Sequence, residues 1–299
     1  MRHILGSHTI DVGGIDMAVR RAANAGLSAV QIFTAIPRFY GDKSTIRPDR
    51  VQRFQSALEE TGISAAHVLV HAAYVLSVAT PDPAKYARAA AGLRKEMERS
   101  TLLGVGSVCF HPGSASGGEV RPALQRVSDA MTAALEAVPG STKLLVENTA
   151  GAGRTVGRTA EEVATILAGL PRSVRDRAGY GLDTCHLFSS GYDITESQAR
   201  FGEVLDEFEQ ATQQKPAFFH LNDSATGLDS NRDRHVLINE GLIGAEPFRW
   251  LLQDDRSLGI PLILETPQQN TGIAREDPSA DPYDVRMVAL LRALGARDA

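Results

Sequence analysis

The 299-residue chain is 43% hydrophobic and 22% charged, as is typical of a globular protein. It has no run of the roughly 18 apolar residues that a membrane-spanning helix needs, so we expect no membrane association. Its net charge of −5, taken alone, argues against a polyanionic ligand.

Cysteine content and the N-terminal sequence predict where the protein resides. Cys109 and Cys185 are too few to crosslink a chain of this length, which is typical of a reducing compartment. The first residues also lack the apolar segment and small-residue cleavage site of a signal peptide. We therefore expect a cytoplasmic protein.

Short apolar segments alternate with longer amphipathic segments along the whole chain. The apolar segments predict strands at residues 4–8, 29–33, 66–71, 107–111, 143–147, 180–183, 217–221 and 262–265. The amphipathic segments predict helices at residues 15–25, 47–61, 83–103, 121–138, 159–170, 197–210, 248–253 and 283–294. This alternation predicts an α/β fold in which eight parallel strands close into a (β/α)8 barrel. Because we find no linker, charge block or low-complexity tract, we expect residues 1–299 to form one domain.

The two longest segments without a periodic pattern are residues 223–244 and 266–282. Each follows a predicted strand, so each should lie at the C-terminal face of the barrel. Long loops at that face usually carry the function of such a barrel.

Six predicted strands end in a residue that can bind a divalent metal ion. These residues are His71, His111, Glu147, Asp183, His220 and Glu265. Side chains alternate across a strand, so each of these residues shares a face with the residue two positions earlier. The earlier residue should fill the barrel interior and the terminal one should project at the rim.

Three further residues with metal-binding side chains, His186, Asp233 and His235, follow these strand ends. Burying four carboxylates and five imidazoles together would be costly without partners, and divalent cations are their natural partners. Nitrogen and oxygen donors suit Zn²⁺, with Mn²⁺ or Fe²⁺ as substitutes. Nine side chains are more than one ion can bind. A carboxylate that bridges two ions would allow the nine to hold three ions. Three divalent ions would change the net charge from −5 to +1, so nucleic acid is not excluded.

Other conspicuous residues have simpler interpretations. His8 ends the first strand and should face the same rim, as a support for a metal ligand or as a substrate contact. Cys185 should be a buried thiol that faces away from its neighbours in the predicted site. His3, His67 and Trp250 are interpreted as structural.

Many of these residues lie in longer sequence motifs. The motifs are GSH at 6–8, HAAYVL at 71–76, FHPGS at 110–114, VENTAG at 146–151, GLDTCHLFSSGYD at 181–193, HLNDS at 220–224, RDRH at 232–235, EGLIG at 240–244, FRW at 248–250 and PLILET at 261–266. Together they resemble the endonuclease IV family of apurinic/apyrimidinic endonucleases over nearly the full chain.

The resemblance implies a (β/α)8 barrel with three zinc ions. It implies that the first ion is held by His71, His111 and Glu147, the second by Glu147, Asp183, His220 and Glu265, and the third by His186, Asp233 and His235. Glu147 would bridge two ions, and Glu265 could also guide the nucleophile.

The resemblance also implies a reaction and a substrate. The expected reaction is hydrolysis of the phosphodiester 5′ to an abasic site in double-stranded DNA, leaving a 3′-hydroxyl and a 5′-deoxyribose phosphate. Removal of 3′-blocking groups is expected as well. We expect the protein to act as a monomer.

Family members insert side chains into DNA at the damaged site, and the matching positions are Arg38, Tyr74 and Val75. Some details depart from the family pattern. Val75 is smaller than the usual leucine, Ala72 replaces a common aspartate, and Asn239 lies in a turn that is usually richer in glycine. These departures concern the DNA contacts and the support of the ligands, not the ligands themselves.

Three alternatives are considered. A metal-dependent sugar isomerase on the same barrel usually needs a lysine near two metals, and Lys143 lies at the wrong end of its strand. A non-catalytic DNA-binding module would not need nine ligands. An amidohydrolase would show His-x-His in the first strand, where this chain has Gly6-Ser7-His8.

Overall fold

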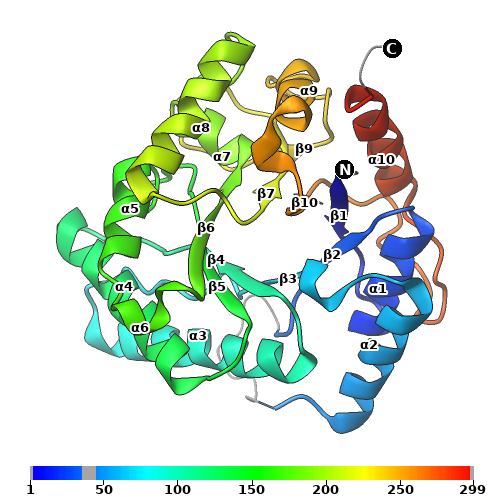
Figure 1. Ribbon diagram of the computed structural model, residues 1–299, viewed down its shortest axis with the longest axis horizontal. Helices are drawn as coiled ribbons and strands as arrows, with labels where there is room; N and C mark the ends of the chain where they lie inside the picture. Colours follow the sequence, from blue (N-terminus) through cyan, green and yellow to red (C-terminus); the bar gives the residue numbers. More distant parts are fainter. Residues whose placement is uncertain (1–2, 36–44, 297–299) are drawn as a thin grey trace.

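The computed structural model describes residues 3–35 and 45–296, and it confirms the predicted α/β barrel. Eight parallel strands close in the order β1-β10-β7-β6-β5-β4-β3-β2 (Figure 1). They are β1 (Ile4–His8), β2 (Ala29–Ile32), β3 (Val68–His71), β4 (Ser107–Phe110), β5 (Lys143–Glu147), β6 (Ala178–Asp183), β7 (Phe219–His220) and β10 (Pro261–Leu264).

Helices surround the barrel (Figure 1), and each buries a set of mostly apolar side chains. They are α1 (Ile15–Asn24), α2 (Pro48–Thr61), α3 (Pro83–Leu103), α4 (Val120–Ala137), α5 (Ala160–Ala168), α8 (Gln198–Thr212), α9 (Glu246–Gln253) and α10 (Pro282–Leu294). In α3 the Asp82 side chain accepts the first free amides, Pro83 occupies the first turn, and Gly104 ends the helix at φ 74°. Among the described residues, no helix is both long and apolar enough to cross a membrane.

Several short elements were not predicted, because each is too short to show a periodic pattern. They are α6 (Arg172–Arg175), α7 (Thr184–Ser189), η1 (Ala65–His67), η2 (Asp255–Ser257) and an antiparallel ribbon of β8 (Asp223–Ser224) with β9 (His235–Val236). The predicted strand at 66–71 begins only at Val68, because the Ser64 side chain caps η1. The predicted strand at 217–221 is reduced to Phe219 and His220.

The barrel interior is filled by a small apolar cluster. Its buried members are Ala29, Leu69, Cys109, Leu145, Phe218 and Ile263. Leu69, Cys109 and Leu145 each lie two positions before a predicted ligand, which confirms the expected alternation. Phe218 fits because position 181 is glycine: a Cβ there would lie 2.1 Å from its ring.

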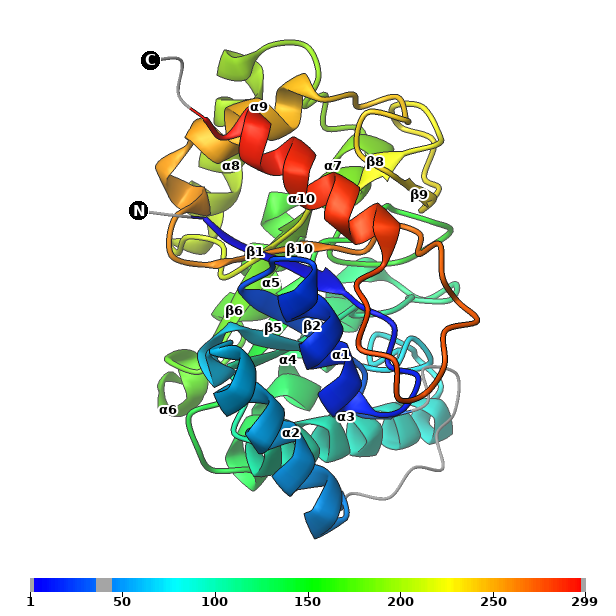
Figure 2. The ribbon, with the colours of Figure 1, turned by 90° about the vertical axis from the view of Figure 1, so that its right-hand side faces the viewer.

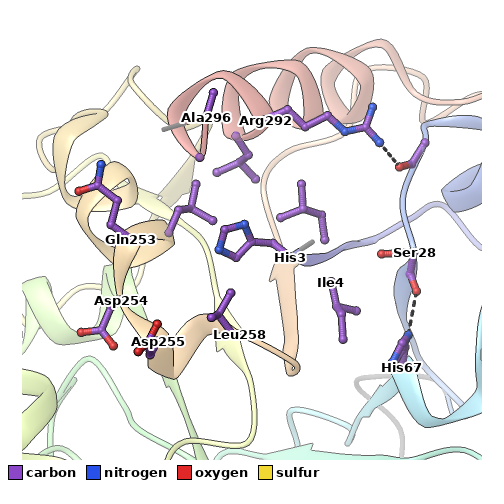
Figure 3. Close-up of a pocket in the computed structure, with 15 residues that line it drawn as sticks. His3, Ile4, Ser28, His67, Gln253, Asp254, Asp255, Leu258, Arg292 and Ala296 are labelled. Atoms are coloured by element: carbon purple, nitrogen blue, oxygen red, sulfur yellow. Dashed lines mark hydrogen bonds between the residues drawn. The ribbon is translucent and has the colours of Figure 1, made fainter. Parts of the chain in front are cut away.

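The two ends of the barrel differ (Figure 2). The ribbon β8–β9 and the long segment between β10 and α10 lie on one side, and the start of β1 lies on the other. At that second, N-terminal end, a cavity of about 850 Å³ is lined by His3, Ser28, His67 and Arg292, among others (Figure 3). None of its lining residues is a predicted metal ligand. His3 and His67 therefore lie away from the predicted site, in agreement with their structural interpretation.

Candidate metal centre

The structure brings all nine predicted ligand side chains together at the C-terminal rim. Donor atoms of eight of them form three adjoining groups, each with all of its atoms within 4.8 Å of one another, and Asp233 lies in a further group with Cys185 and His235. The groups are His71 with His111 and Glu147; Glu147 with Asp183, His220 and Glu265; and Asp183 with His186 and His235. The register of the parallel strands produces this convergence, because their carboxyl ends meet at one edge of the barrel.

In the first group two imidazoles face one carboxylate oxygen. His71 Nε2 lies 3.4 Å and His111 Nε2 3.2 Å from Oε2 of Glu147. The His71 ring is held by its other nitrogen, Nδ1, which lies 2.8 Å from the main-chain oxygen of Ala72. The alanine at position 72 therefore still supports this ring through its backbone, although it lacks the carboxylate that is common in the family.

The second group surrounds His220. Its Nδ1 lies 2.8 Å from Glu147 Oε1, 3.3 Å from Glu265 Oε2 and 3.9 Å from Asp183 Oδ2. Glu147, Asp183 and His220 are completely buried. Three carboxylates at this separation repel one another unless cations neutralise them.

The third group differs in detail from the set that the sequence motifs imply. Asp233 does contact both imidazoles, at 3.3 Å from His186 Nε2 and 2.9 Å from His235 Nε2. However, Asp183 Oδ2 also lies 3.5 Å from His235 Nε2, so Asp183 is a second carboxylate beside this imidazole. Cys185 is buried as expected, but the expectation that it faces away was wrong: its thiol lies within 4.8 Å of donor atoms of Asp233 and His235. Residue 185 lies in α7, not in an extended segment, and the helix turns its side chain toward the ribbon.

Four buried atoms of this cluster have no hydrogen-bond partner. They are His71 Nε2, His111 Nε2, Glu147 Oε2 and His235 Nε2, whose 2.9 Å contact with Asp233 lacks the angles of a hydrogen bond. Buried polar atoms are almost always paired, because an unpaired one costs about 1–3 kcal/mol. All four belong to the metal-binding groups, and nitrogen and carboxylate donors at these separations fit divalent metal ions. The residues present therefore fit the group that the sequence predicted.

In the metal-free cluster, the pKa values of the imidazoles and carboxylates depend on two opposing effects, burial and the attraction between opposite charges. Burial alone would lower the pKa of His71, but the Glu147 and Glu265 carboxylates raise it to about 9. Burial alone would also lower the pKa of His220, but the Glu147 and Glu265 carboxylates raise it. Burial alone would also raise the pKa of Glu265, but His220 and His71 lower it to about 2. Without metal, the centre is thus held together at neutral pH by imidazolium–carboxylate pairs.

We expect metal uptake at pH 7 to release more than one proton per chain. A metal ion needs neutral imidazoles, whereas His71 and His220 carry raised pKa values in the metal-free protein. Protons therefore compete with the metal below about pH 9, so its affinity should rise with pH up to that value and then level off. Calorimetric titration in two buffers of different ionisation enthalpy measures the protons released. Equal heats in the two buffers would contradict this expectation.

Several supporting residues were missed by the sequence analysis. Asn222 donates from Nδ2 to Asp183 Oδ2 at 2.6 Å and accepts from the main-chain amide of Glu265 at 3.0 Å. Asn148 accepts the amide of Asp183 at 2.7 Å, and its main-chain oxygen lies 2.9 Å from His186 Nδ1. Asn148 directly follows the predicted ligand Glu147, and Asn222 lies two residues after the predicted ligand His220. This closeness in sequence to the ligands could have identified both asparagines.

A buried carboxylate organises the loop beside the third group. Asp223 is completely buried and accepts the main-chain amides of Ser224, Asn239, Gly241, Ile243 and Gly244 at 2.7–3.2 Å. Asn239 adopts φ 70°, a conformation that asparagine tolerates well, so its difference from the family turn preserves this network.

Replacing Asp223 by asparagine should lower the free energy of unfolding by about 2–4 kcal/mol, because an amide cannot accept from all five donors. Denaturant unfolding at pH 7 measures this change. Asp129→Asn, at an exposed position on α4, is the control and should have little effect. A loss no larger than that of the control would show that these hydrogen bonds do not hold the loop.

The remaining predicted site residues that the structure describes lie at the same rim. His8 contacts Gln31 and Phe33, and burial lowers its pKa to about 4, so it is neutral at pH 7. Tyr74 is 54% exposed, yet its ring centre lies 5.0 Å from that of His71 and 6.1 Å from that of His111. Val75 is partly buried against the core beside it. Arg38 lies outside the described residues.

Comparison with known proteins agrees with this geometry. A family model described as "Xylose isomerase-like TIM barrel" matches residues 19–284. A protein of Geobacter sulfurreducens named "Probable endonuclease 4" is 34% identical over 99% of this chain and 96% of its own length. A protein of the same name from Geotalea daltonii is 37% identical over 90% of this chain and 93% of its own length. This chain belongs to the endonuclease IV family.

Solved structures extend the comparison. The crystal structure of endonuclease IV from Thermus thermophilus is 32% identical and matches with a TM-score of 0.78, covering 97% of this chain and 98% of that one. D-Psicose 3-epimerase from Clostridium cellulolyticum matches with a TM-score of 0.67 at 12% identity, covering 98% and 99%. At that identity the epimerase shares only the fold. The endonuclease IV family membership and the donor groups together indicate a divalent metal centre.

Proposed function

We propose that this protein is a DNA-repair endonuclease that hydrolyses the phosphodiester 5′ to an abasic site in double-stranded DNA. Its products would be a 3′-hydroxyl and a 5′-deoxyribose phosphate. The observation that carries this proposal is the convergence of nine metal-binding side chains on one rim, in a chain similar to endonuclease IV proteins along its whole length. We further propose that the protein is a cytoplasmic monomer.

The metal in this proposal is zinc, with three ions per chain and Mn²⁺ or Fe²⁺ as substitutes. The three groups would hold one ion each, with Glu147 shared between the first and second. Asp233 would complete the third group with His186 and His235. When bound, such ions would supply a nucleophile at neutral pH and positive charge to offset the charge that develops on the phosphate.

The protein's own residues would prepare this chemistry. The buried carboxylates provide the negative charge that retains cations, and Asn222 holds both Asp183 and the main chain of Glu265 in place. Glu265 would also guide the nucleophile, a role that the approach of its Oε2 to the second group supports. A site of this kind would also remove blocking groups from 3′ ends.

A nicking assay tests the proposal. A duplex with one abasic site should be cut once, directly 5′ to the site, and the new end should be extended by a polymerase without further processing. An undamaged duplex of the same sequence should stay intact. A product cut 3′ to the site, or no cut at all by zinc-loaded protein, would refute the proposed activity.

The sugar isomerase alternative has less support. Epimerases share this fold, but they do so at 12–19% identity. Lys143, the lysine nearest a strand in the sequence analysis, is exposed at the first residue of β5, at the end of the barrel opposite the metal centre. Assaying the purified protein with ketohexoses should therefore show no epimerisation.

We also propose that Tyr74, Val75 and Arg38 enter the duplex at the damaged site, with His8 as a further contact at the rim. The exposed Tyr74 ring beside His71 and His111 supports this role, because it places a stacking surface next to the reacting group. Abasic sites are the least costly to open, since no base pair is broken there.

Substituting Tyr74 or Arg38 by alanine should weaken binding to abasic duplex by about 1–3 kcal/mol each, the scale of stacking contacts. Fluorescence anisotropy measures the binding, and metal content should stay near that of the wild type. Tyr74→Phe keeps the ring and is the matched control. Val75→Leu should tighten binding slightly. If both alanine variants bind and incise as well as the wild type, these side chains do not enter the duplex.

A further inference from the structure

Gln31 is a buried polar residue in the otherwise apolar strand β2. It is completely buried and lies beside His8 in the register of the parallel strands. Its Nε2 lies 2.5 Å from Glu265 Oε1 and 2.9 Å from His8 Nδ1. Its Oε1 lies 2.7 Å from His220 Nε2. One amide thus contacts two residues of the same metal-binding group, His220 at the end of β7 and Glu265 directly after β10.

The donors and acceptors in this network can be assigned from its chemistry. An ionised carboxylate only accepts, so the side of Gln31 that faces Glu265 is the NH₂ group. The carbonyl oxygen then faces His220, and an oxygen only accepts. His220 must therefore carry a proton on Nε2. Without metal its Nδ1 can donate to Glu147 Oε1 at 2.8 Å, and loss of that proton leaves Nδ1 as the nitrogen for a metal ion.

The same contacts select one oxygen of Glu265. Oε1 is occupied by Gln31, whereas Oε2 lies 3.3 Å from His220 Nδ1. Once His220 Nδ1 has lost its proton, each residue therefore presents one defined metal-binding atom to the second group, Nδ1 of His220 and Oε2 of Glu265. Without Gln31, the His220 ring could turn over and Glu265 could rotate, and neither donor atom would be defined in advance.

We propose that Gln31 is the positioning residue of the second metal group: it sets the tautomer of His220 and the free oxygen of Glu265. This inference rests on the proposed metal centre but not on the identity of the substrate. The proposal predicts that both polar atoms of the Gln31 amide are needed for tight metal binding, the oxygen to orient His220 and the nitrogen to orient Glu265.

Two substitutions separate these contributions. Gln31→Met removes both contacts at similar volume. Gln31→Glu keeps an acceptor for His220 but cannot donate to Glu265. Gln268→Met is the matched control, because Gln268 also donates to a carboxylate, that of Asp284, but contacts no predicted ligand.

The first measurement is NMR of zinc-loaded protein labelled with ¹⁵N in its eight histidines, with His220 assigned by a His220→Gln variant. The wild type should show the His220 proton on Nε2, shifted downfield by its bond to Gln31. Gln31→Glu should keep that signal, and Gln31→Met should move it upfield. A wild-type proton on Nδ1 would overturn the assignment.

The second measurement is zinc release to an excess of chelator. Loss of a residue that orients metal ligands typically costs about 10–100-fold in affinity, so Gln31→Met and Gln31→Glu should release zinc at least about tenfold faster. Gln268→Met should match the wild type. Wild-type release from Gln31→Met would overturn the proposal, and wild-type release from Gln31→Glu would overturn the part that concerns Glu265. Normal NMR and zinc release in a protein that does not cut abasic DNA would refute the proposed function alone.

Discussion

Replacing Glu147 by glutamine should reduce incision of abasic duplex by about 10²–10³-fold or more, the scale of losing a group that stabilises the transition state. Glu147 Oε2 faces His71 and His111, and Oε1 faces His186 and His220. A neutral amide can neither share two ions nor balance these imidazoles. Incision kinetics under single-turnover conditions measure the loss.

The same substitution should remove more metal than a change at the edge of the centre. Elemental analysis should find about three zinc ions in the wild type, about two after His235→Gln and about one after Glu147→Gln, since only Glu147 is proposed to bridge two ions. Glu119→Gln, at an exposed position, should retain all three. Equal metal loss from Glu147→Gln and His235→Gln would show that Glu147 does not bridge.

Incision should continue without free magnesium and should decline slowly in a strong chelator. The donor atoms are mostly buried, so bound ions should exchange slowly with the solvent. Zinc added after complete removal should restore activity, because the ligands stay on a rigid barrel. A time course of incision in chelator, with and without magnesium, measures this behaviour.

Two outcomes would contradict that expectation. An absolute need for added magnesium, or an immediate stop in chelator, would show that the ions are held weakly at the surface. The metal-free protein should also remain folded near neutral pH, since imidazolium–carboxylate pairs replace the ions. Those pairs stabilise the metal-free fold fully below pH 6.5, and the stability should fall as pH rises toward the raised pKa of His71, about 9. Thermal unfolding of the metal-free protein at pH 6.5 and 9 tests this.

The repeating pattern of the barrel could be predicted from the sequence because it depends on local rules. Side chains alternate along a strand, so an apolar residue two positions before a ligand predicts both the interior and the rim. Leu69 and His71 show this in β3, and Cys109 with His111 show it at the end of β4. Parallel strands place their carboxyl ends together, so the convergence follows from the order of strands and helices alone.

The grouping of the side chains was decided by the tertiary structure. Gln31 contacts His8, Glu265 and His220, which are up to 234 residues away in sequence. No local pattern encodes which strands become neighbours around a closed barrel, or which oxygen of a carboxylate stays free. Asp183 joins His186 and His235 only because α7 and the β8–β9 ribbon pack together. The sequence by itself determined which residues reach the rim, because alternation is a property of one strand. Only the tertiary structure decided which of them meet and by which atom, because those contacts depend on strand register, on the packing of α7 against the ribbon and on hydrogen bonds between distant segments.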